Sequence, residues 1–235
     1  MVDTRVRSEA PEIMDDFSME GEILRDALDK IAAINKLLGG NKVTLDAVKT
    51  LIRRQPPGTI ISILDVGCGN GDMLRTLAHY ARKHGLLFKL HGIDANAFTI
   101  RHAEQLSAEY AEISYSSKDI FGYNLPAQYD IILCTLTLHH FKDVQLLELM
   151  HYFIKQSRLG VVVNDLHRSA LAYYLFKLIC TLFGLNDMSR EDGLVSILRG
   201  FKRQDLEGYS KSLQLKKYSI RWKWAFRYQW IIQAL

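Results

Sequence analysis

Three acids and a run of glycines are the residues best placed to bind a ligand. The segment 61–71 (ISILDVGCGNG) holds Asp65 two residues before the first of three alternating glycines, Asp94 ends a later apolar run, and Asp119 follows the strand predicted near 111–116. Glycine lacks a Cβ, so its backbone can pass close beneath a bound molecule. A carboxylate such as Asp94 can accept hydrogen bonds from both hydroxyls of a ribose. The pattern predicts a nucleotide-like ligand.

Three histidines could move a proton beside that ligand. His139, His140 and His167 each follow the end of an apolar run, and imidazole is the side chain most easily poised near neutral pH. We favour a structural role for His140 and consider His139 or His167 as a general base. With Asp165 nearby, the same histidines could also hold a metal. They lack a local ligand motif, so we expect none.

The elements that must position these residues alternate along the chain. A strand, a glycine turn, a helix and a strand ending in Asp94 form a βαβ unit, whose ligands bind at the carboxyl ends of its strands. Its glycines at 67, 69 and 71 do not follow the dinucleotide pattern G-x-G-x-x-G. We predict strands near 60–66, 87–93, 111–116, 129–134, 160–165, 213–220 and 222–234, and helices near 22–38, 43–54, 71–84, 97–109, 143–157, 169–185, 190–200 and 203–211.

Four segments resemble the ordered motifs of the class I S-adenosylmethionine-dependent methyltransferases. They are 63–71 (ILDVGCGNG), 91–94 (HGID), 118–120 (KDI), and 129–134 (YDIILC) followed by 138–141 (LHHF). Within that family the chain looks like the small-molecule enzymes of the ubiquinone and menaquinone group. Segments 11–16, 34–40 and 164–168 also look like bacterial methyltransferases of polyketide or phenolic-lipid pathways.

The resemblance implies an α/β fold with a Rossmann-like, seven-stranded, mostly parallel sheet. Helices would cover both faces, and the strands predicted at 213–220 and 222–234 would form an antiparallel pair at one edge, ending in an antiparallel C-terminal strand. We expect residues 1–58 to form an N-terminal helical cap and residues 59–235 the methyltransferase domain, with a lid insertion near 167–200.

The resemblance also assigns residues to the cofactor, S-adenosyl-L-methionine. Asp65 would orient the turn and the cofactor ammonium, Asp94 would hold the ribose diol, and Asp119 would accept from the adenine amino group. The remaining expected cofactor contacts, made mostly by backbone and apolar groups, are Gly67, Cys68, Gly69, Gly71, Ala95, Ile120, Cys134 and Thr135.

The expected reaction moves the sulfonium methyl group to an acceptor and releases S-adenosylhomocysteine. Such chemistry needs alignment, exclusion of water and, where necessary, removal of a proton. The aromatic residues Tyr173, Tyr174 and Phe176 could supply a flat apolar slot, so we expect a small aromatic or lipid-like acceptor. Oxygen is the first choice of acceptor atom and an activated ring carbon the second.

Composition limits the other functions that the chain could have. The 235 residues carry a net charge of +4, and residues 199–235 hold nine Lys or Arg against two acids. From 221 to 230, aromatic and charged residues largely alternate, which favours a half-buried strand over a nucleic-acid surface. No secretory pattern or membrane span is expected, and three cysteines favour a reducing cytoplasm. A catalytically silent cofactor-binding scaffold and an RNA or protein methyltransferase remain the alternatives, and the oligomeric state stays open.

Overall fold

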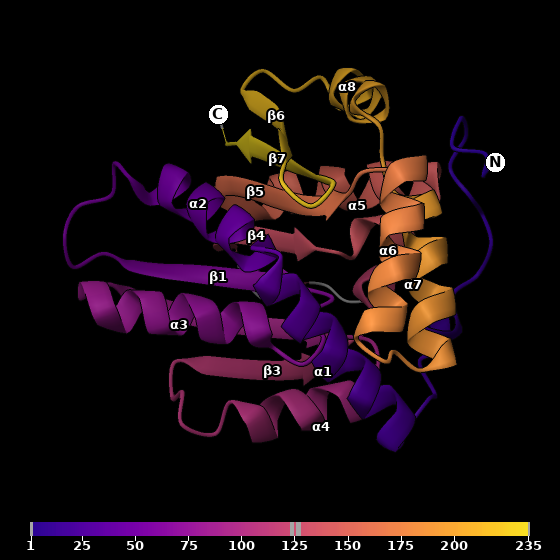
Figure 1. The fold of residues 1–235 in the computed structure, drawn as a ribbon. Helices are drawn as coiled ribbons and strands as arrows, with labels where there is room; N and C mark the ends of the chain where they lie inside the picture. Colours follow the sequence, from indigo (N-terminus) through magenta and orange to yellow (C-terminus); the bar gives the residue numbers. More distant parts are fainter. Residues whose placement is uncertain (1, 123–124, 126–127, 235) are drawn as a thin grey trace.

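Seven strands form one sheet in the order β3-β2-β1-β4-β5-β7-β6 in a computed structural model that describes residues 2–122, 125 and 128–234 (Figure 1). β1, β2, β3, β4 and β5 pair in parallel, whereas β7 runs antiparallel to both of its neighbours. The expected fold class is confirmed. The strands are β1 (Ile60–Val66), β2 (Leu87–Asp94), β3 (Ile113–Ser117), β4 (Tyr129–Thr135), β5 (Ser157–Leu166), β6 (Tyr218–Lys223) and β7 (Arg227–Gln233).

Helices cover both faces of the sheet because its central strands are apolar on both sides. One core joins α2 (Gly40–Ile52), α3 (Asp72–His84) and α4 (Ala97–Leu106) to one face. The other core joins α5 (Asp143–Gln156) and α8 (Arg203–Ser212) to the opposite face, around the buried Trp230. The resemblance implied helices on both faces, and each expected helix is present within a few residues of its predicted bounds.

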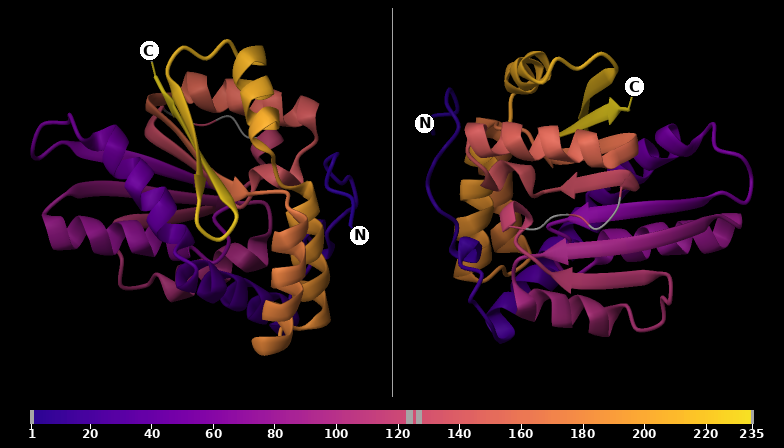
Figure 2. Two further views of the ribbon diagram at one scale, coloured as in Figure 1. Left: turned by 45° about the horizontal axis from the view of Figure 1, so that its top comes forward. Right: turned by 180° about the vertical axis from the view of Figure 1, so that it is seen from behind.

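The carboxyl ends of the parallel strands are covered by three segments (Figures 1 and 2). Helices α6 (Ala170–Leu182) and α7 (Asp187–Arg199) stand side by side across this edge of the sheet. Residues 2–20, which we call the N-terminal strap, run along the outer side of these helices and lead into α1 (Glu22–Leu37). None of the helices within the described part of the chain is long and apolar enough to cross a membrane.

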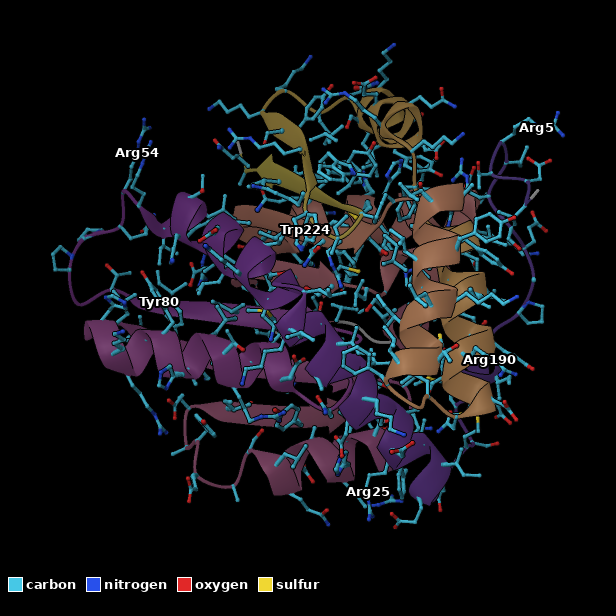
Figure 3. The ribbon with its side chains drawn as sticks, viewed as in Figure 1. Arg5, Arg25, Arg54, Tyr80, Arg190 and Trp224 are labelled. Atoms are coloured by element: carbon cyan, nitrogen blue, oxygen red, sulfur yellow. The ribbon has the colours of Figure 1, made fainter. Side chains whose placement is uncertain are left out.

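The prediction of one strand over 222–234 is wrong. The chain reverses at Ala225 and Phe226, whose φ angles are +60° and +53°, and β6 and β7 form a hairpin on either side. Two consecutive residues of positive φ are usually marked by Asn or Gly, and neither occurs here. The predicted division into one buried and one wet face also fails. β7 is buried on both faces, while Trp224 at the turn is 74% exposed (Figure 3).

Replacing Trp230 by Ala should cost about 3–5 kcal/mol of unfolding free energy, since a fully buried indole leaves a cavity between β7 and its helices. Urea denaturation would measure this loss. Trp224→Ala is the matched control and should change the free energy by less than about 0.5 kcal/mol, because that side chain is exposed. Equal losses in the two variants would contradict the position assigned to β7.

Candidate functional site

The glycine turn after β1 is tied to the end of β2 by backbone hydrogen bonds. The N–H groups of Gly67 and Cys68 donate to the carbonyl of Ile93 at 2.9 and 3.1 Å, and Gly69 N–H donates to Asp94 Oδ2 at 3.1 Å. Gly67, Gly69 and Gly71 have φ angles of +67°, +53° and +78°, a region that other residues adopt at a cost. The turn therefore brings Asp94 beside the start of α3.

Two acids expected at the cofactor lie next to this turn, Asp65 near the end of β1 and Asp94 at the end of β2, and burial acts on the pKa of both. Asp94 also accepts a hydrogen bond from Asn96 N–H at 3.1 Å, and burial raises the pKa of Asp94. Asp65 is 2% exposed, and no described residue forms a hydrogen bond to its Oδ1. Burial, with Asp72 and Asp94 nearby, raises the pKa of Asp65 well above its ordinary value. Asp65 thus presents a buried, unpartnered carboxyl oxygen.

Arg227 is a buried cation that sequence reasoning missed. It lies opposite Leu166 at the end of β5 and is 4% exposed, and its Nε and Nη1 have no hydrogen-bond partner among the described residues. Burial lowers its pKa to about 10, against the attraction of Asp165 and Asp72. Ile63, two residues from Asp65 along β1, and Ile231, four residues from Arg227 along β7, pack in the core beneath α2 and α3. Since strand side chains alternate, Asp65 and Arg227 project to that same face.

Helix α1 is fastened onto the glycine turn. Asp29 accepts hydrogen bonds from Asn70 Nδ2 at 2.9 Å and from His102 Nε2 at 2.8 Å, while Leu28 is the nearest side chain to Gly69. Asn41 at the start of α2 donates to Asp72 at 2.8 Å. The segment expected to be a helical cap thus contacts the turn directly.

The other residues expected at the cofactor are spread along the same edge. Asp119 is exposed and accepts from Phe121 N–H at 3.0 Å, while Ile120 is buried. The Ala95 carbonyl accepts from Ser117 Oγ at 3.3 Å. Cys134 is fully buried at the end of β4, and Thr135 Oγ1 lies 3.2 Å from Thr44 Oγ1 in α2.

His139 is locked in place by Asp165. Its Nδ1 lies 2.7 Å from Asp165 Oδ1, and its backbone N–H donates to Oδ2 at 3.1 Å. Both side chains are buried, at 3% and 1% exposure. Burial raises the pKa of Asp165, but His139 outweighs it and the net shift is downward. Because an ionised carboxylate only accepts, His139 Nδ1 carries the ring proton, and Nε2 keeps its lone pair.

The N-terminal strap and α7 close over this histidine pair. His140 Nδ1 lies 2.7 Å from Asp15 Oδ1, and Arg199 bonds Asp15 Oδ2 at 2.7 Å. Arg199 also donates to the carbonyls of His139 and His140. Glu12 is buried beside them, with Oε1 3.7 Å from His139 Nε2.

Arg7 adds a second connection between the strap and the loop after β4. It donates to the carbonyls of His139 and Phe141 at 3.1 and 3.0 Å, and its charge pairs with Asp143 at 2.7 Å. Sequence reasoning did not single out Arg7, Glu12, Asp15 or Arg199 as site residues. Glu12 and Asp15 do fall in segment 11–16, whose resemblance to other methyltransferases is the signal that could have found them.

His167 belongs to a different neighbourhood. Its Nδ1 accepts from Trp222 Nε1 at 3.2 Å, and its ring packs edge-on against Tyr228. Burial, with Lys202 and Arg168 nearby, lowers its pKa. Of the three histidines, His139 and His140 are brought together, with ring centroids 4.3 Å apart, and His167 packs against the hairpin.

The three aromatic residues expected at the acceptor lie on α6. Tyr174 is 49% exposed and accepts from Val2 N–H at 3.4 Å, and the rings of Tyr173 and Tyr174 meet edge to face. Phe176 packs tightly on Gly193 of α7. This contact gives Phe176 a part in joining the two helices.

Residues 63–160 match the family described as "Methyltransferase domain". No curated protein matches the chain. Among solved structures, the plantazolicin methyltransferase BpumL in complex with SAH is similar at a TM-score of 0.66 and 16% identity, over 88% of this chain and 89% of that one.

Two further solved structures share the fold. The CurJ carbon methyltransferase is similar at a TM-score of 0.62 and 14% identity, over 83% of this chain and 54% of that one. Magnesium protoporphyrin IX methyltransferase (ChlM) from Synechocystis PCC 6803, with bound SAH, is similar at a TM-score of 0.57 and 15% identity, over 86% and 87%. These similarities establish the architecture of the sheet and its helices.

The geometry of the glycine turn predicts that Gly71→Ala destabilises the protein more than Gly85→Ala. Both glycines have positive φ, which should cost alanine about 1–2 kcal/mol. A Cβ at Gly71 would also lie 2.0 Å from Tyr115 Oη, whereas nothing lies within 4 Å at Gly85. We expect about 1–3 kcal/mol of additional loss at Gly71 in urea denaturation. Similar losses would show that Tyr115 does not restrict the turn.

Proposed function

We propose that this chain, a class I S-adenosylmethionine-dependent methyltransferase, methylates a hydroxyl group of a small aromatic or lipid-like acceptor. The single observation that carries the proposal is the buried His139–Asp165 pair. It stands after β4, at the edge of the sheet where the glycine turn and its acids lie. When bound, S-adenosylmethionine supplies a methyl group on positively charged sulfur.

The unpartnered charges of the site support this cofactor. Its amino-acid end carries an ammonium and a carboxylate, and Asp65 and Arg227 offer a buried oxygen and buried N–H groups without partners among the described residues. Asp65 would accept from the ammonium, and Arg227 would donate to the carboxylate. Asp94 would accept from the ribose hydroxyls, with Gly69 N–H and Asn96 N–H holding its carboxylate in place.

The chemistry assigned to His139 is removal of the acceptor's proton. Asp165 holds Nδ1–H, so Nε2 is free to accept the hydroxyl proton as the oxygen takes the methyl group. Asp165 then stabilises the imidazolium that forms, as a carboxylate does beside a catalytic histidine. We assign His140, held by Asp15 and stacked near His139, to positioning.

The outer face of α6 favours an apolar acceptor. Leu171, Leu175 and Leu178 are 60%, 42% and 56% exposed there, and Tyr174 lies beside them. A run of exposed leucines on a helix at the carboxyl edge of the sheet suits a lipid-like or aromatic molecule better than a charged one.

The three cysteines bear on the compartment in which the chain works. Cys68, Cys134 and Cys180 are all buried free thiols, which is consistent with a reducing cytoplasm.

Methylation of a ring carbon is the second candidate reaction, because the same base could remove a proton from carbon. A silent scaffold would not need a buried base.

Asp94→Ala should weaken the binding of S-adenosylmethionine at least about tenfold, because it removes charge-assisted hydrogen bonds to the ribose. Calorimetric titration would measure the dissociation constant. Asp94→Asn keeps the shape of the turn and should weaken binding in the same direction. The control is Asp46→Ala, which changes a surface ion pair on α2 and should leave binding intact. Unchanged affinity in the Asp94 variants would remove Asp94 from the cofactor site.

His139→Gln and Asp165→Asn should each lower the rate of methyl transfer to alkylphenols by about 10²–10⁴-fold while retaining cofactor binding. Mass spectrometry of the product would locate the methyl group, and the matching alkylbenzenes, which lack a hydroxyl, should give no product. His79→Gln changes an exposed histidine and should leave the rate of methyl transfer unchanged. Ring methylation would favour carbon over oxygen, and normal rates in both variants would exclude the proposed base.

A further inference from the structure

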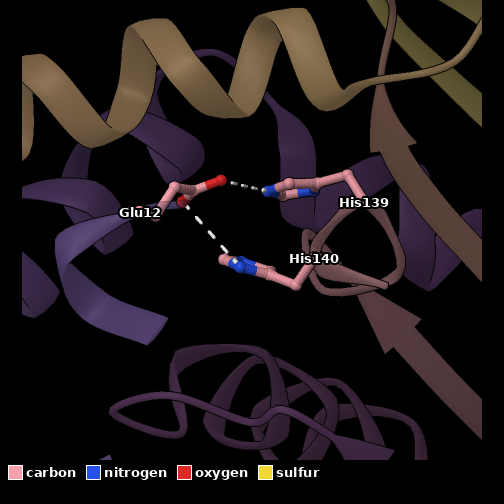
Figure 4. Close-up of side chains that lie close together, drawn as sticks. All are labelled: Glu12, His139 and His140. Atoms are coloured by element: carbon pink, nitrogen blue, oxygen red, sulfur yellow. Dashed lines mark ion pairs between the residues drawn. The ribbon is translucent and has the colours of Figure 1, made fainter. Parts of the chain in front are cut away.

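Glu12, His139 and His140 converge on one point between the strap and the loop after β4 (Figure 4). One potential ligand atom from each side chain lies within 4.8 Å of the other two. Glu12 Oε1 is 3.7 Å from His139 Nε2, and Glu12 Oε2 is 3.9 Å from His140 Nδ1. The residues come from segments more than 120 positions apart in the sequence, so only the fold brings them together.

Two of these atoms face each other without a hydrogen-bond partner. Glu12 Oε1 and His139 Nε2 are buried, on side chains that are 4% and 3% exposed, and no described residue bonds either of them. His139 Nε2 holds a lone pair because Asp165 takes the proton of Nδ1, and an ionised Glu12 also only accepts. A separation of 3.7 Å is too long for a shared proton. Ligand atoms around tetrahedral zinc lie about 3.3 Å apart, so a metal ion would need little rearrangement.

The groups behind these side chains are those that orient metal ligands. Asp165 holds His139 and Asp15 holds His140, each at 2.7 Å from Nδ1. Ser196 Oγ donates to Glu12 Oε2 at 2.8 Å. In His139 the Asp165 carboxylate lies on the far ring nitrogen, which fixes the tautomer and the direction of a metal-binding histidine. In His140 the nitrogen nearest Glu12 is the one that Asp15 holds, so His140 would bind a metal through its other nitrogen, Nε2.

The charges around the cluster leave room for a cation. Glu12, Asp15 and Asp165 are three carboxylates, and Arg199 is the cation that contacts them, at 3.5 Å from Glu12 and 2.7 Å from Asp15. Arg7 also reaches this loop, but its charge is paired with another acid, as described above. Arg227 attracts Asp165, so with neutral histidines the three carboxylates exceed the two arginines by one charge, which a bound cation would offset.

We propose that Glu12, His139 and His140 form a binding site for a divalent transition metal ion of the zinc type. Two imidazole nitrogens and one carboxylate oxygen suit Zn²⁺, whereas Mg²⁺ and Ca²⁺ prefer ligands that are all oxygen. The three ligands leave a fourth position for water. The sequence expectation of no metal rested on the missing local motif, and Glu12 supplies from the strap the ligand that no local motif could contain.

The metal site is a feature beyond the proposed function, and a bound metal would prevent the proposed reaction. One lone pair on His139 Nε2 cannot hold a metal ion and accept a proton, so the metal-bound chain lacks its base. The metal also joins the strap to the loop after β4. We therefore assign an inhibitory role to the metal, which blocks methyl transfer without occupying the cofactor site.

The test is calorimetric titration of the full chain, freed of metal by a chelator, with ZnCl₂ at neutral pH. We expect one equivalent of Zn²⁺ to bind, and Co²⁺ in its place to give the visible absorption of a tetrahedral site. Glu12→Gln and His140→Ala should each weaken binding by about 10–100-fold. His140 is 26% exposed, so its truncation disturbs packing less than a change at Glu12. Binding of S-adenosylmethionine serves as the check on folding.

Two control variants separate this site from adventitious zinc. Glu9→Gln alters an exposed acid of the same strap, and His151→Ala alters an exposed histidine of α5, so both should bind Zn²⁺ like the parent chain. Absence of stoichiometric binding, or equal binding by the Glu12 and His140 variants, would overturn the site. Zn²⁺ should also stop methyl transfer, and a chelator should restore it. Persistent transfer by the zinc-loaded chain would overturn the inhibitory role. Transfer in chelator tests the proposed function separately.

Discussion

The bond between Asp165 and His139 is the interaction on which the rest of the site depends. Asp165 sits near the end of β5 with 1% of its side chain exposed, and it accepts from both the backbone and the ring of His139. A buried carboxylate left without such donors would cost several kcal/mol. The bond therefore fixes the short helix at Leu138–His140, and with it the direction in which both histidine rings face.

Two of the segments that cover the carboxyl edge of the sheet are held in place by hydrogen bonds to this loop. Arg7 and Arg199 come from the strap and from α7, and both donate to backbone carbonyls of this loop. Arginine can reach several acceptors at once because its donors form a rigid fork. Since α6 packs on α7 through Phe176 and Gly193, the position of the loop also determines where the exposed face of α6 stands.

Local patterns in the sequence predicted the sheet, its helices and the glycine turn, because each depends on residues close together in the chain. The antiparallel pairing of the last two strands was expected, but the position of their turn at Ala225 and Phe226 was not, since its positive φ angles are not marked by Asn or Gly. Arg227 escaped prediction for a related reason. A basic residue next to aromatic ones is typical of a half-exposed strand, and only the position of β7 between β5 and β6 buries it.

Buried polar atoms without hydrogen-bond partners divide the site into two parts. A buried polar atom without a partner costs about 1–3 kcal/mol, and this edge of the sheet holds such atoms on Asp65, Arg227, Glu12 and His139. The first two lie on the face of α2 and α3, where an ammonium and a carboxylate would satisfy both. The other two face each other beneath the strap, where Arg199 Nη1 lies 3.5 Å from Glu12 Oε1 and neither Glu12 Oε1 nor His139 Nε2 has a hydrogen-bond partner among the described residues. Because the second set lies beside the strap and not on the face of α2 and α3, we expect a separate group, a divalent ion or an acceptor hydroxyl, to satisfy it.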